Sequence, residues 1–599
     1  MHSTRFAAAL ISALLSVAAA QFCEEPADLP SLLIGTSSGT TGPALLRGYD
    51  GWLTLAGPLE LTFDPGGPTS YNFNQQLQRV ETMFVDWINN PEPGPFSSGR
   101  GGLAVGGKRL ALRFAWVNDN DQAVVNETEL QASVANATAV ATRGSNASFA
   151  WAGFSSELTR FMVPQAVADG YLVMSGGAAS TLIFSNNDTY PWAFGLLPSE
   201  KNYSYNSMEA ISLAAEQIDE GGSTWEFASL CTGPNGCKAA IRIGRLQQED
   251  DTFAEVYCAA VPGDAAGFGL DATGPHVTVG VRDSDEEYEK NLQILRDQGV
   301  NVVVGCITTA GPGIKLLEAL HRMAWAPWAV IVNVIETEKL LDLTREPFYE
   351  SYIYEFFLSP VSWAKEREGR GNFTNMTSQE FSTEYAARFN GDTVSWLGAA
   401  QWGAAAALCT AIERADSLER LAVANELQKL ELEEFYAKIK FDEQNQLDAP
   451  ILLLQFEGNS TDTKPPQPTL VYPFRACDDP HKKHCKPELI SRGFQFPTPP
   501  WPVRLCWTSC ARIDPASGTC LRDGTCSCAP GWEGDNCEVQ TQNNTGTVAA
   551  IGIVLGLLGV ALVGFVGYKM WRFTQSANRT KQLLLDSQKV WHFRHYFLT

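Results

Sequence analysis

An uncharged apolar run near the C-terminal end constrains this chain most. Val548–Tyr568 (VAAIGIVLGLLGVALVGFVGY) contains no charged side chain, and about 20 consecutive apolar residues suffice for an α-helix to cross a bilayer. The tail from Lys569 to Thr599 holds six Lys and Arg residues against the single Asp586, an excess typical of the cytoplasmic side. The run therefore predicts one transmembrane helix, residues 548–568, with a short cytoplasmic tail, 569–599.

The N-terminus is typical of a chain that enters the secretory pathway. Arg5 precedes the apolar residues Phe6–Val17, and Ala18-Ala19-Ala20 stand before Gln21. This order predicts a signal peptide over residues 1–20 that is removed after cleavage. With one later membrane helix, it predicts a single-pass type I protein of the plasma membrane whose N-terminus is extracellular.

Cysteines and glycosylation sequons agree with that topology. All 14 cysteines lie between Cys23 and Cys537, before the apolar run, which favours disulfides formed in an oxidising compartment. The same part of the chain holds nine Asn-x-Ser/Thr sequons, which together predict a glycosylated surface. Their asparagines are Asn126, Asn136, Asn146, Asn187, Asn202, Asn372, Asn375, Asn459 and Asn543.

The formal net charge of −23 excludes one class of partner. Proteins that bind nucleic acid carry basic patches that neutralise phosphates. The basic tail makes the extracellular part still more acidic than the whole chain, so we expect no nucleic-acid partner.

Residues 29–473 alternate short β-rich runs with helical periodicity, a pattern that favours parallel sheets covered by helices on both faces. The expected strands are Arg109–Val117, Ala150–Phe154, Tyr171–Met174, Val277–Val281, Val300–Gly305 and Trp328–Asn333. The expected helices are Arg79–Asn89, Glu127–Ala141, Glu157–Asp169, Tyr205–Glu220, Glu286–Gln298, Ile314–Met323, Gln379–Phe389 and Trp396–Arg414. We expect Ala437–Phe441 and Pro450–Phe456 to close the unit as a hairpin.

Two such series in one chain predict two lobes, and several segments resemble a known family. GGLAVGGKRLALRFAWVNDN (101–120), WAGFSSELTRFMVPQAVADGYLVMSGGAAST (151–181) and WAFGLLPSEKNYSY (192–205) are similar, in order and spacing, to the type 1 periplasmic-binding-protein family, which includes receptor ligand-binding domains. IKFDEQNQL resembles the closing hairpin of the family, with Asn445 where glycine is usual. The resemblance implies an α/β fold: a two-lobed clamshell of doubly wound parallel sheets that closes on a small ligand.

One region departs from the family pattern. The stretch Gly35–Pro95 is long and rich in glycine and proline, and Arg79–Asn89 is its one good helical segment. We therefore expect the first strand at Leu32–Gly35, followed by an insertion.

The resemblance implies that two turns of the first lobe hold a ligand carboxylate. Ser155 and Ser156 stand between a strand and a helix, where free backbone N–H groups and the helix dipole favour an anion. Gly177–Ser180 is a second turn whose small residues allow close approach. The positions that match the family are Ser155, Ser156, Ala178, Ala179 and Ser180. The alternative interpretation is that Ser155 is only an N-cap and that the second turn is a plain turn.

Contacts from the second lobe are expected at Tyr203 and Tyr205, near the aromatic contact of the family, unless they belong to a glycosylated loop at Asn202. Residues that directly follow strands, namely Thr308, Thr309 and Glu336, are further candidates for the cleft.

Between this unit and the membrane, residues 474–502 read as a linker rich in proline with two cysteines. Residues 503–538 end in CSCAPGWEGDNC and resemble an EGF-like module, which needs disulfides because so small a unit cannot build a core. The family pattern implies the pairs Cys506–Cys520, Cys510–Cys526 and Cys528–Cys537. The residues WPVRL before Cys506 lack the acidic side chains of the calcium-binding variant, so we expect no metal.

The remaining cysteines leave alternatives open. Cys477 and Cys485 flank a short polar loop and are expected to pair with each other. Cys231 pairs with Cys237, or either of them pairs with Cys258. Cys306 and Cys409 are expected to be buried thiols, and Cys23 has no assigned partner.

These features favour a cell-surface receptor-like protein that binds an amino acid, amide or carboxylate by lobe closure. The alternative is an adhesion or matrix-binding protein with no small-molecule ligand. We expect no enzyme and no cofactor, because the sequence has no Gly-x-Ser-x-Gly or His-Glu-x-x-His motif and the tail is too short for a catalytic domain. Gly552 and Gly556 form a Gly-x-x-x-Gly pair, the spacing through which membrane helices form a homodimer; the alternative is that the two glycines have no such role, since glycine is common in membrane helices. A cytoplasmic signalling partner is not identified by the sequence.

Overall fold

The computed structural model describes residues 49–58, 73–92, 94, 96–117, 127–153, 155–184, 190–220, 231, 235–308, 310–333, 351–457, 467–472, 496–499, 501, 518–520, 525–534, 537, 539–540 and 567–572. The chain divides into two compact units. The first is Met1–Ser509 with Arg522–Gly524, and the second is Cys510–Leu521 with Thr525–Thr599.

The first lobe of the large unit is built on a six-stranded sheet with the order β2-β3-β1-β4-β5-β6. All neighbouring strands are parallel except β2, which pairs antiparallel with β3. The strands are β1 (Gly51–Pro58), β2 (Leu103–Val105), β3 (Lys108–Val117), β4 (Phe149–Ala152), β5 (Val173–Ser175) and β6 (Ala193–Gly195).

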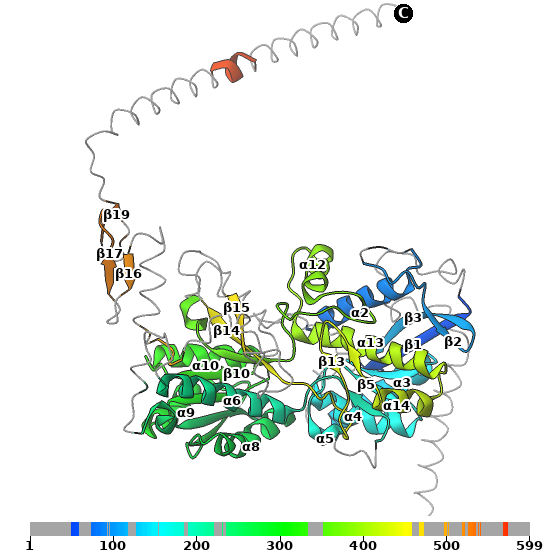
Figure 1. Ribbon diagram of the computed structural model, residues 1–599, viewed down its shortest axis with the longest axis horizontal. Helices are drawn as coiled ribbons and strands as arrows, with labels where there is room; N and C mark the ends of the chain where they lie inside the picture. Colours follow the sequence, from blue (N-terminus) through cyan, green and yellow to red (C-terminus); the bar gives the residue numbers. More distant parts are fainter. Residues whose placement is uncertain are drawn as a thin grey trace, which may run out of the picture. The chain divides into compact units, whose positions relative to one another are not determined.

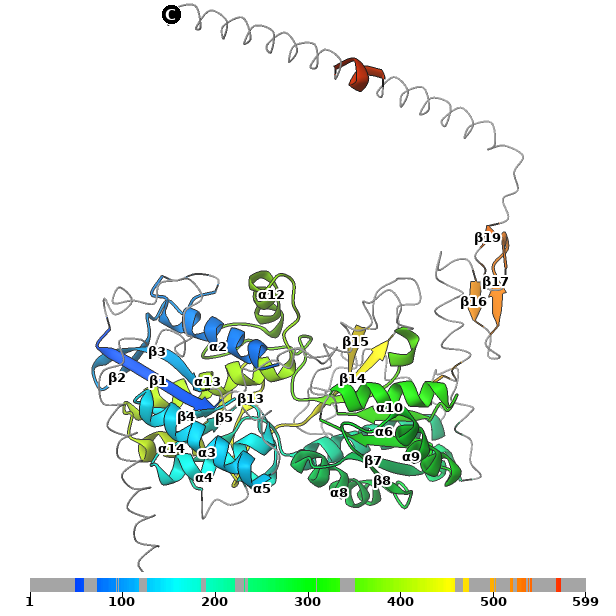
Figure 2. The same ribbon diagram turned by 180° about the vertical axis from the view of Figure 1, so that it is seen from behind.

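Helices cover both faces of this sheet, as Figures 1 and 2 show. One face carries α2 and α13, which pack against each other, and the opposite face carries α3 and α4. The helices of this lobe are α2 (Phe73–Asn89), α3 (Glu127–Gly144), α4 (Ser156–Ala168), α5 (Thr181–Phe184), α12 (Ser378–Arg388), α13 (Trp396–Ala415) and α14 (Arg420–Gln428).

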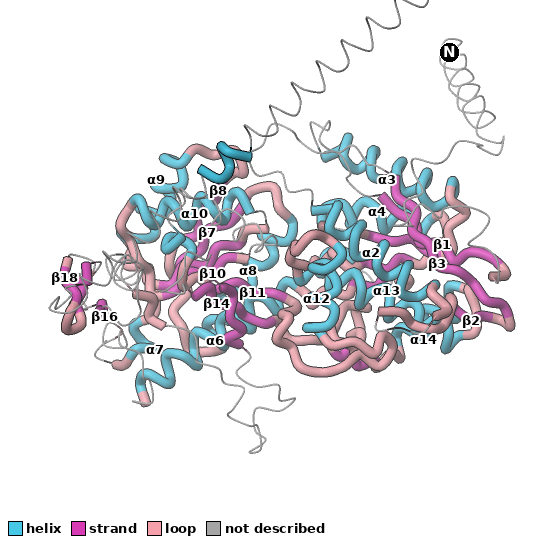
Figure 3. The backbone as a smooth tube through the Cα atoms, turned by 90° about the horizontal axis from the view of Figure 1, so that it is seen from above, coloured by secondary structure: helices cyan, strands magenta, loops and turns pink. Residues whose placement is uncertain are grey.

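The second lobe is built on a seven-stranded sheet with the order β15-β14-β11-β10-β9-β7-β8. Its strands are β7 (Ile243–Gln248), β8 (His276–Val279), β9 (Val302–Cys306), β10 (Ala329–Val332), β11 (Leu358–Val361), β14 (Leu452–Glu457) and β15 (Gln467–Tyr472). The run from β8 to β11 is parallel, and β14 and β15 complete the edge antiparallel. The main helices are α6 (Glu200–Asp219), α8 (Thr252–Gly267), α9 (Asp285–Asp297) and α10 (Ala310–Arg322), which Figure 3 shows around the sheet. Two shorter helical segments are α7 (Cys237–Ala240) and η3 (Ser351–Tyr354).

The structure confirms the predicted alternation and corrects one prediction, and it contains three elements that were not expected. The expected hairpin is wrong in its strands, although its turn is present as an antiparallel bridge between Phe441 and Leu447. β13 (Lys438–Ile439) pairs with β12 (Leu432–Glu433), whereas β14 joins the large sheet of the second lobe. β1 was not expected, although it lies in the centre of its sheet. β7 and α8 were also missed. The expected strand Leu32–Gly35 lies outside the described residues.

The chain passes between the lobes three times, at residues 196–199, 362–377 and 440–451. The third crossing is bonded to the end of β6, the strand that precedes the first crossing. The N–H of Gly195 donates to the carbonyl of Asn445, and the N–H of Leu447 donates to the carbonyl of Gly195, both at 2.9 Å. Gly195 has no room for a side chain, because a Cβ would lie 2.6 Å from the Phe184 ring.

The helix α8 contains Pro262, although the sequence pattern did not predict a helix there. Pro262 has no N–H, so the carbonyl of Cys258, four residues earlier, loses its helical partner. The Arg245 guanidinium of β7 donates to that carbonyl at 3.1 Å. Cys258 also forms a disulfide with Cys306 of β9, so α8 is fixed to the sheet by two separate bonds.

The disulfides therefore differ in part from the expectations. Cys306 is not a free thiol. Cys231 pairs with Cys237, one of the alternatives, and Cys409 is a buried free thiol, as expected. In the second unit Cys528 pairs with Cys537, and Cys526 is disulfide-bonded. This unit contains two small antiparallel ribbons, β16 (Gly518–Cys520) with β17 (Cys526–Cys528) and β18 (Trp532–Glu533) with β19 (Val539–Gln540). Cys23, Cys477, Cys485, Cys506 and Cys510 lie outside the described residues.

Several other predictions concern residues that are only partly described. The expected membrane helix, 548–568, lies almost entirely outside the described residues, and among the residues that are described no helix is long and apolar enough to span a bilayer. Asn136, Asn146, Asn372 and Asn375 are exposed, whereas the side chain of Asn202 donates to the carbonyl of Ala449 at 3.2 Å. Asn126, Asn187, Asn459 and Asn543 lie outside the described residues. Glycosylation stays a prediction.

The core of the first lobe contains a carboxyl group that burial disfavours in its charged form. Glu81 of α2 is only 2 % exposed. One of its oxygens accepts from the Trp151 indole at 2.7 Å, and the other has no hydrogen-bond partner. Burial raises the pKa of Glu81 well above its ordinary value. The stability that the protonated Glu81 side chain contributes is therefore fully present below the pKa that Glu81 has in the unfolded chain. This stability is lost as the pH rises through the pKa that Glu81 has in the folded protein.

We expect Glu81→Gln to stabilise the protein at pH 8 and to have little effect at pH 5. The amide keeps an acceptor for the Trp151 indole and cannot ionise. One proton contributes at most about 1.4 kcal/mol per pH unit. Thermal denaturation of both proteins from pH 5 to pH 8 measures the difference. Glu129→Gln, at an exposed position of α3, is the control. A difference between Glu81→Gln and the native protein that does not change with pH would contradict the prediction.

Candidate functional site

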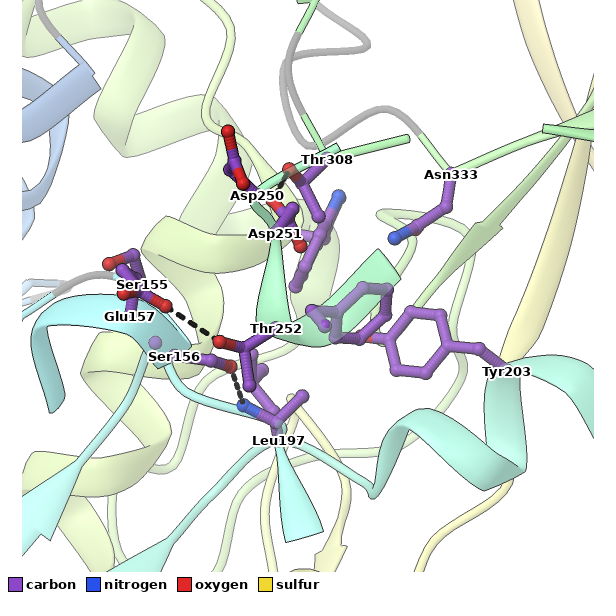
Figure 4. A pocket seen from close by; sticks show the side chains of 14 residues that line it. Ser155, Ser156, Glu157, Leu197, Tyr203, Asp250, Asp251, Thr252, Thr308 and Asn333 are labelled. Atoms are coloured by element: carbon purple, nitrogen blue, oxygen red, sulfur yellow. Dashed lines mark hydrogen bonds between the residues drawn. The ribbon is translucent and has the colours of Figure 1, made fainter. Parts of the chain in front are cut away.

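A cavity lies between the two lobes of the large unit, where α4 of the first lobe approaches α8 of the second (Figure 4). Its empty volume of ≈ 650 Å³ includes space that is open to solvent. The lining residues come from the ends of strands and the starts of helices: Ser155, Ser156, Glu157, Gly177, Ala179, Leu197, Tyr203, Asp250, Asp251, Thr252, Phe253, Thr308, Asn333 and Trp396.

Ser155 caps α4 in a strained backbone conformation. Its φ of 72° is in the region that L-residues rarely adopt. Its hydroxyl accepts from the N–H of Leu158 at 3.0 Å, so it is an N-cap, as the alternative interpretation stated. It also lines the cavity. Backbone strain at a non-glycine residue costs of order 1–3 kcal/mol and is concentrated at functional sites.

Ser156 joins α4 to the second turn of the first lobe. Its hydroxyl accepts from the backbone N–H groups of Ala179 and Ser180, each at 3.2 Å. The Ser175 hydroxyl accepts from Ala178 at 3.1 Å and from Gly177 at 3.4 Å. The N–H of Thr181 donates to the buried carboxylate of Glu200 at 2.8 Å. Side-chain oxygens of the protein thus already accept from each N–H of the turn 177–181.

The two lobes are bridged directly at the cavity. The Thr252 hydroxyl, in the second lobe, donates to Glu157 of the first lobe at 2.6 Å. The other oxygen of Glu157 accepts from Arg160 at 2.6 Å. The charge of Glu157 therefore has a cationic partner within its own helix, and its contact with the second lobe is a hydrogen bond to a hydroxyl.

The wall formed by the second lobe is acidic. Asp251 caps α8, accepting from the N–H of Ala254 at 2.7 Å, and it also accepts from the Thr308 hydroxyl. Burial raises the pKa of Asp251, opposed by the Thr308 hydrogen bond. Asp250 precedes it, exposed and with a φ of 55°. Among the described residues, no cation forms an ion pair with either carboxylate.

Polar groups without partners also border the cavity. Asn333 is 1 % exposed, its Oδ1 has no hydrogen-bond partner, and Figure 4 shows its side chain directed into the cavity. The hydroxyl of Tyr203 and the indole N–H of Trp396 are likewise buried without partners. Buried polar atoms normally make hydrogen bonds, so each buried polar atom without one needs an explanation, such as a missing partner. Tyr203 and Phe253 pack edge to face, with centroids 5.2 Å apart.

The structure brings together about half of the residues expected from sequence. Ser155, Ser156, Ala179, Tyr203 and Thr308 line the cavity. Ala178 and Ser180 are fully buried and do not line it. Tyr205 is 48 % exposed and packs on Phe268 instead. Thr309 and Glu336 lie outside the described residues.

Asp250, Asp251 and Phe253 of the second lobe were not predicted from sequence, because β7 and α8 were not expected. Asn333 was assigned to the end of a strand, whereas β10 ends at Val332. The position of Asn333 directly after a strand was therefore the signal that could have marked it as a candidate site residue. Trp396 opens α13, just after the N-cap Ser395.

The fold has counterparts among solved structures, although no known family model matches the sequence. A candidate branched-chain amino acid ABC transporter protein from Silicibacter pomeroyi is 16 % identical with a TM-score of 0.51, covering 74 % of this chain and 99 % of that one. A solute-binding protein of an ABC transporter from R. palustris, in complex with 4-hydroxybenzoate, is 12 % identical with a TM-score of 0.50, covering 70 % and 96 %. The large unit has the two-lobed α/β fold of these proteins, which confirms the predicted architecture. Such low identity shows the fold alone.

Proposed function

We propose that this chain is a single-pass cell-surface receptor-like protein that binds a small extracellular molecule between its two lobes. The observation that carries the proposal is the cavity itself. It is bordered from both lobes, and the buried amide of Asn333 is directed into it without a partner for its oxygen. A ligand that supplies this partner and contacts both walls would favour the closed arrangement of the lobes.

The neighbouring structures support small-molecule binding, since one of them holds 4-hydroxybenzoate. The placement at the cell surface is supported by the signal-like N-terminus, the cysteines and the apolar run. The ligand class proposed from sequence is an amino acid, an amide or a carboxylate.

We expect thermal denaturation of the full-length chain in detergent to reveal a ligand among amino acids, amides, polyamines and small carboxylates. A ligand that binds only the folded state adds about 2.7 kcal/mol at a hundredfold excess over its Kd. The shift should saturate and should be lost in Asn333→Ala, which removes a side chain that makes no hydrogen bond among the described residues. Asn425→Ala, at an exposed position in α14, should keep it.

A well-folded protein that no compound stabilises would overturn the proposal. The adhesion alternative, in which the α/β unit has no small-molecule ligand, would then be preferred. Binding of the same chain to a surface or matrix protein would test that alternative directly.

A further inference from the structure

The turn 177–181 of the first lobe does not offer the free N–H groups that a ligand carboxylate would need. The hydroxyls of Ser175 and Ser156 and the carboxylate of Glu200 accept from the whole turn, at 2.8–3.4 Å. At the start of α4, Ser155 occupies the N–H of Leu158. An anion could bind at the turn only by displacing hydrogen bonds already made, and Glu200 would repel it from behind the turn.

The charges at the cavity also oppose an anion. Among the described residues that line it there is no Lys, Arg or His. The Arg160 guanidinium, which belongs to the same helix as the lining residue Glu157, is paired with that carboxylate at 2.6 Å. Neither Asp250 nor Asp251 has such a cation. Asp251 accepts from the Ala254 N–H and the Thr308 hydroxyl, whereas Asp250 has no partner among the described residues, so no described cation neutralises the negative charge of the second-lobe wall. Two adjacent carboxylates in a partly enclosed site attract a cation.

The remaining groups suit a cation with an apolar body. Tyr203, Phe253 and Trp396 supply aromatic surface, and an ammonium group near aromatic faces gains further attraction. The Asn333 amide makes no hydrogen bond among the described residues, so rotation about its last torsion presents Oδ1 to the cavity at no loss of a bond. An ammonium group has three donors and no acceptor, which matches carboxylate and amide oxygens.

We propose that the cavity binds a primary amine, with its ammonium group against Asp250 and Asp251 and its apolar body against Tyr203 and Trp396. A carboxylate on the ligand is not required and is disfavoured. This inference rests on the proposed function and replaces the ligand class that the family resemblance implies.

Isothermal titration of the full-length chain in detergent tests the inference with two matched sets of probes. The first set is 2-phenylethylamine, 3-phenylpropionate and phenylalanine. The second is 3-methylbutylamine, 4-methylpentanoate and leucine. In at least one set the amine should bind at least tenfold tighter than the carboxylate and the amino acid. Asp250→Asn should weaken amine binding roughly tenfold to a hundredfold, the range expected for a hydrogen bond to a charged group.

A matched variant separates local charge from overall charge. Glu249→Gln removes a carboxylate from the residue next to Asp250, outside the cavity lining, and should leave amine binding unchanged. Asp251 is not substituted, because it caps α8. Equal or tighter binding of the carboxylates or amino acids, or no effect of Asp250→Asn, would overturn the inference and leave the proposed function standing. Failure of every probe and of the wider library would overturn both.

Discussion

Trp402→Ala is expected to destabilise the first lobe by about 3–5 kcal/mol, the usual cost of truncating a fully buried aromatic side chain. Trp402 of α13 is 0 % exposed and stands in the middle of an aromatic cluster. Its ring centroid lies 4.9 Å from Phe84, 5.2 Å from Phe381 and 5.7 Å from Trp87. These neighbours come from α2 and α12, so one truncation leaves a cavity where three helices meet. Thermal denaturation should show a fall in Tm of roughly ten degrees or more.

Two variants make this prediction specific. Trp402→Phe keeps most of the buried ring and should lose clearly less stability than the alanine variant. Leu421→Ala, at a position 54 % exposed, should change Tm little. A Tm for Trp402→Ala within a degree or two of the native value would mean that the cluster is not the centre of the core.

Removal of the Cys258–Cys306 disulfide is the second change with a large expected effect. The bond closes a loop of 48 residues in sequence. The chain-entropy estimate for such a loop is about 4 kcal/mol, because the cross-link restricts the unfolded chain. The double variant Cys258→Ala, Cys306→Ala should therefore have a markedly lower Tm. The double variant should also bind the ligand identified by the screen more weakly. The disulfide joins α8, whose cap Asp251 lines the cavity, to β9, which is followed by the lining residue Thr308.

The buried thiol Cys409 provides the control for this experiment. Cys409→Ala removes a sulfur atom of the same size from the core without breaking a cross-link, so it measures the packing cost alone. If the double variant lost no more stability than twice that cost, the disulfide would contribute little, and the entropic account would be refuted for this protein.

Much of the fold followed from local patterns that carry their own physical cause. The strand at Val302–Cys306 is apolar throughout because it is buried on both faces, as central parallel strands are. The helix at Asp285–Asp297 begins at a capping box formed by Ser284 and Glu287. Such signals depend on a few neighbouring residues and were therefore visible in the sequence.

The elements that were missed owe their structure to distant partners. The proline inside α8 argues locally against a helix, and it is tolerated because Arg245 of another strand satisfies the freed carbonyl. β13 and β14 look like a hairpin in sequence, but β14 pairs with the distant strand β11, and β13 pairs with its neighbour β12. The candidate site shared this difficulty, since Asp250 and Asp251 join the cavity only when β7 and α8 are placed.

The bonds between Gly195 and residues 445–447 have a mechanical consequence. They hold the first part of the third crossing on the sheet of the first lobe, so at this crossing the lobes can turn relative to each other only through the residues that follow Leu447. The angle between the lobes describes this motion. A ligand that binds to both walls of the cavity would fix the value of that angle. A pair of fluorophores, one on α9 and one on α14, can follow such an angle even while the chemical identity of the bound molecule is still unassigned.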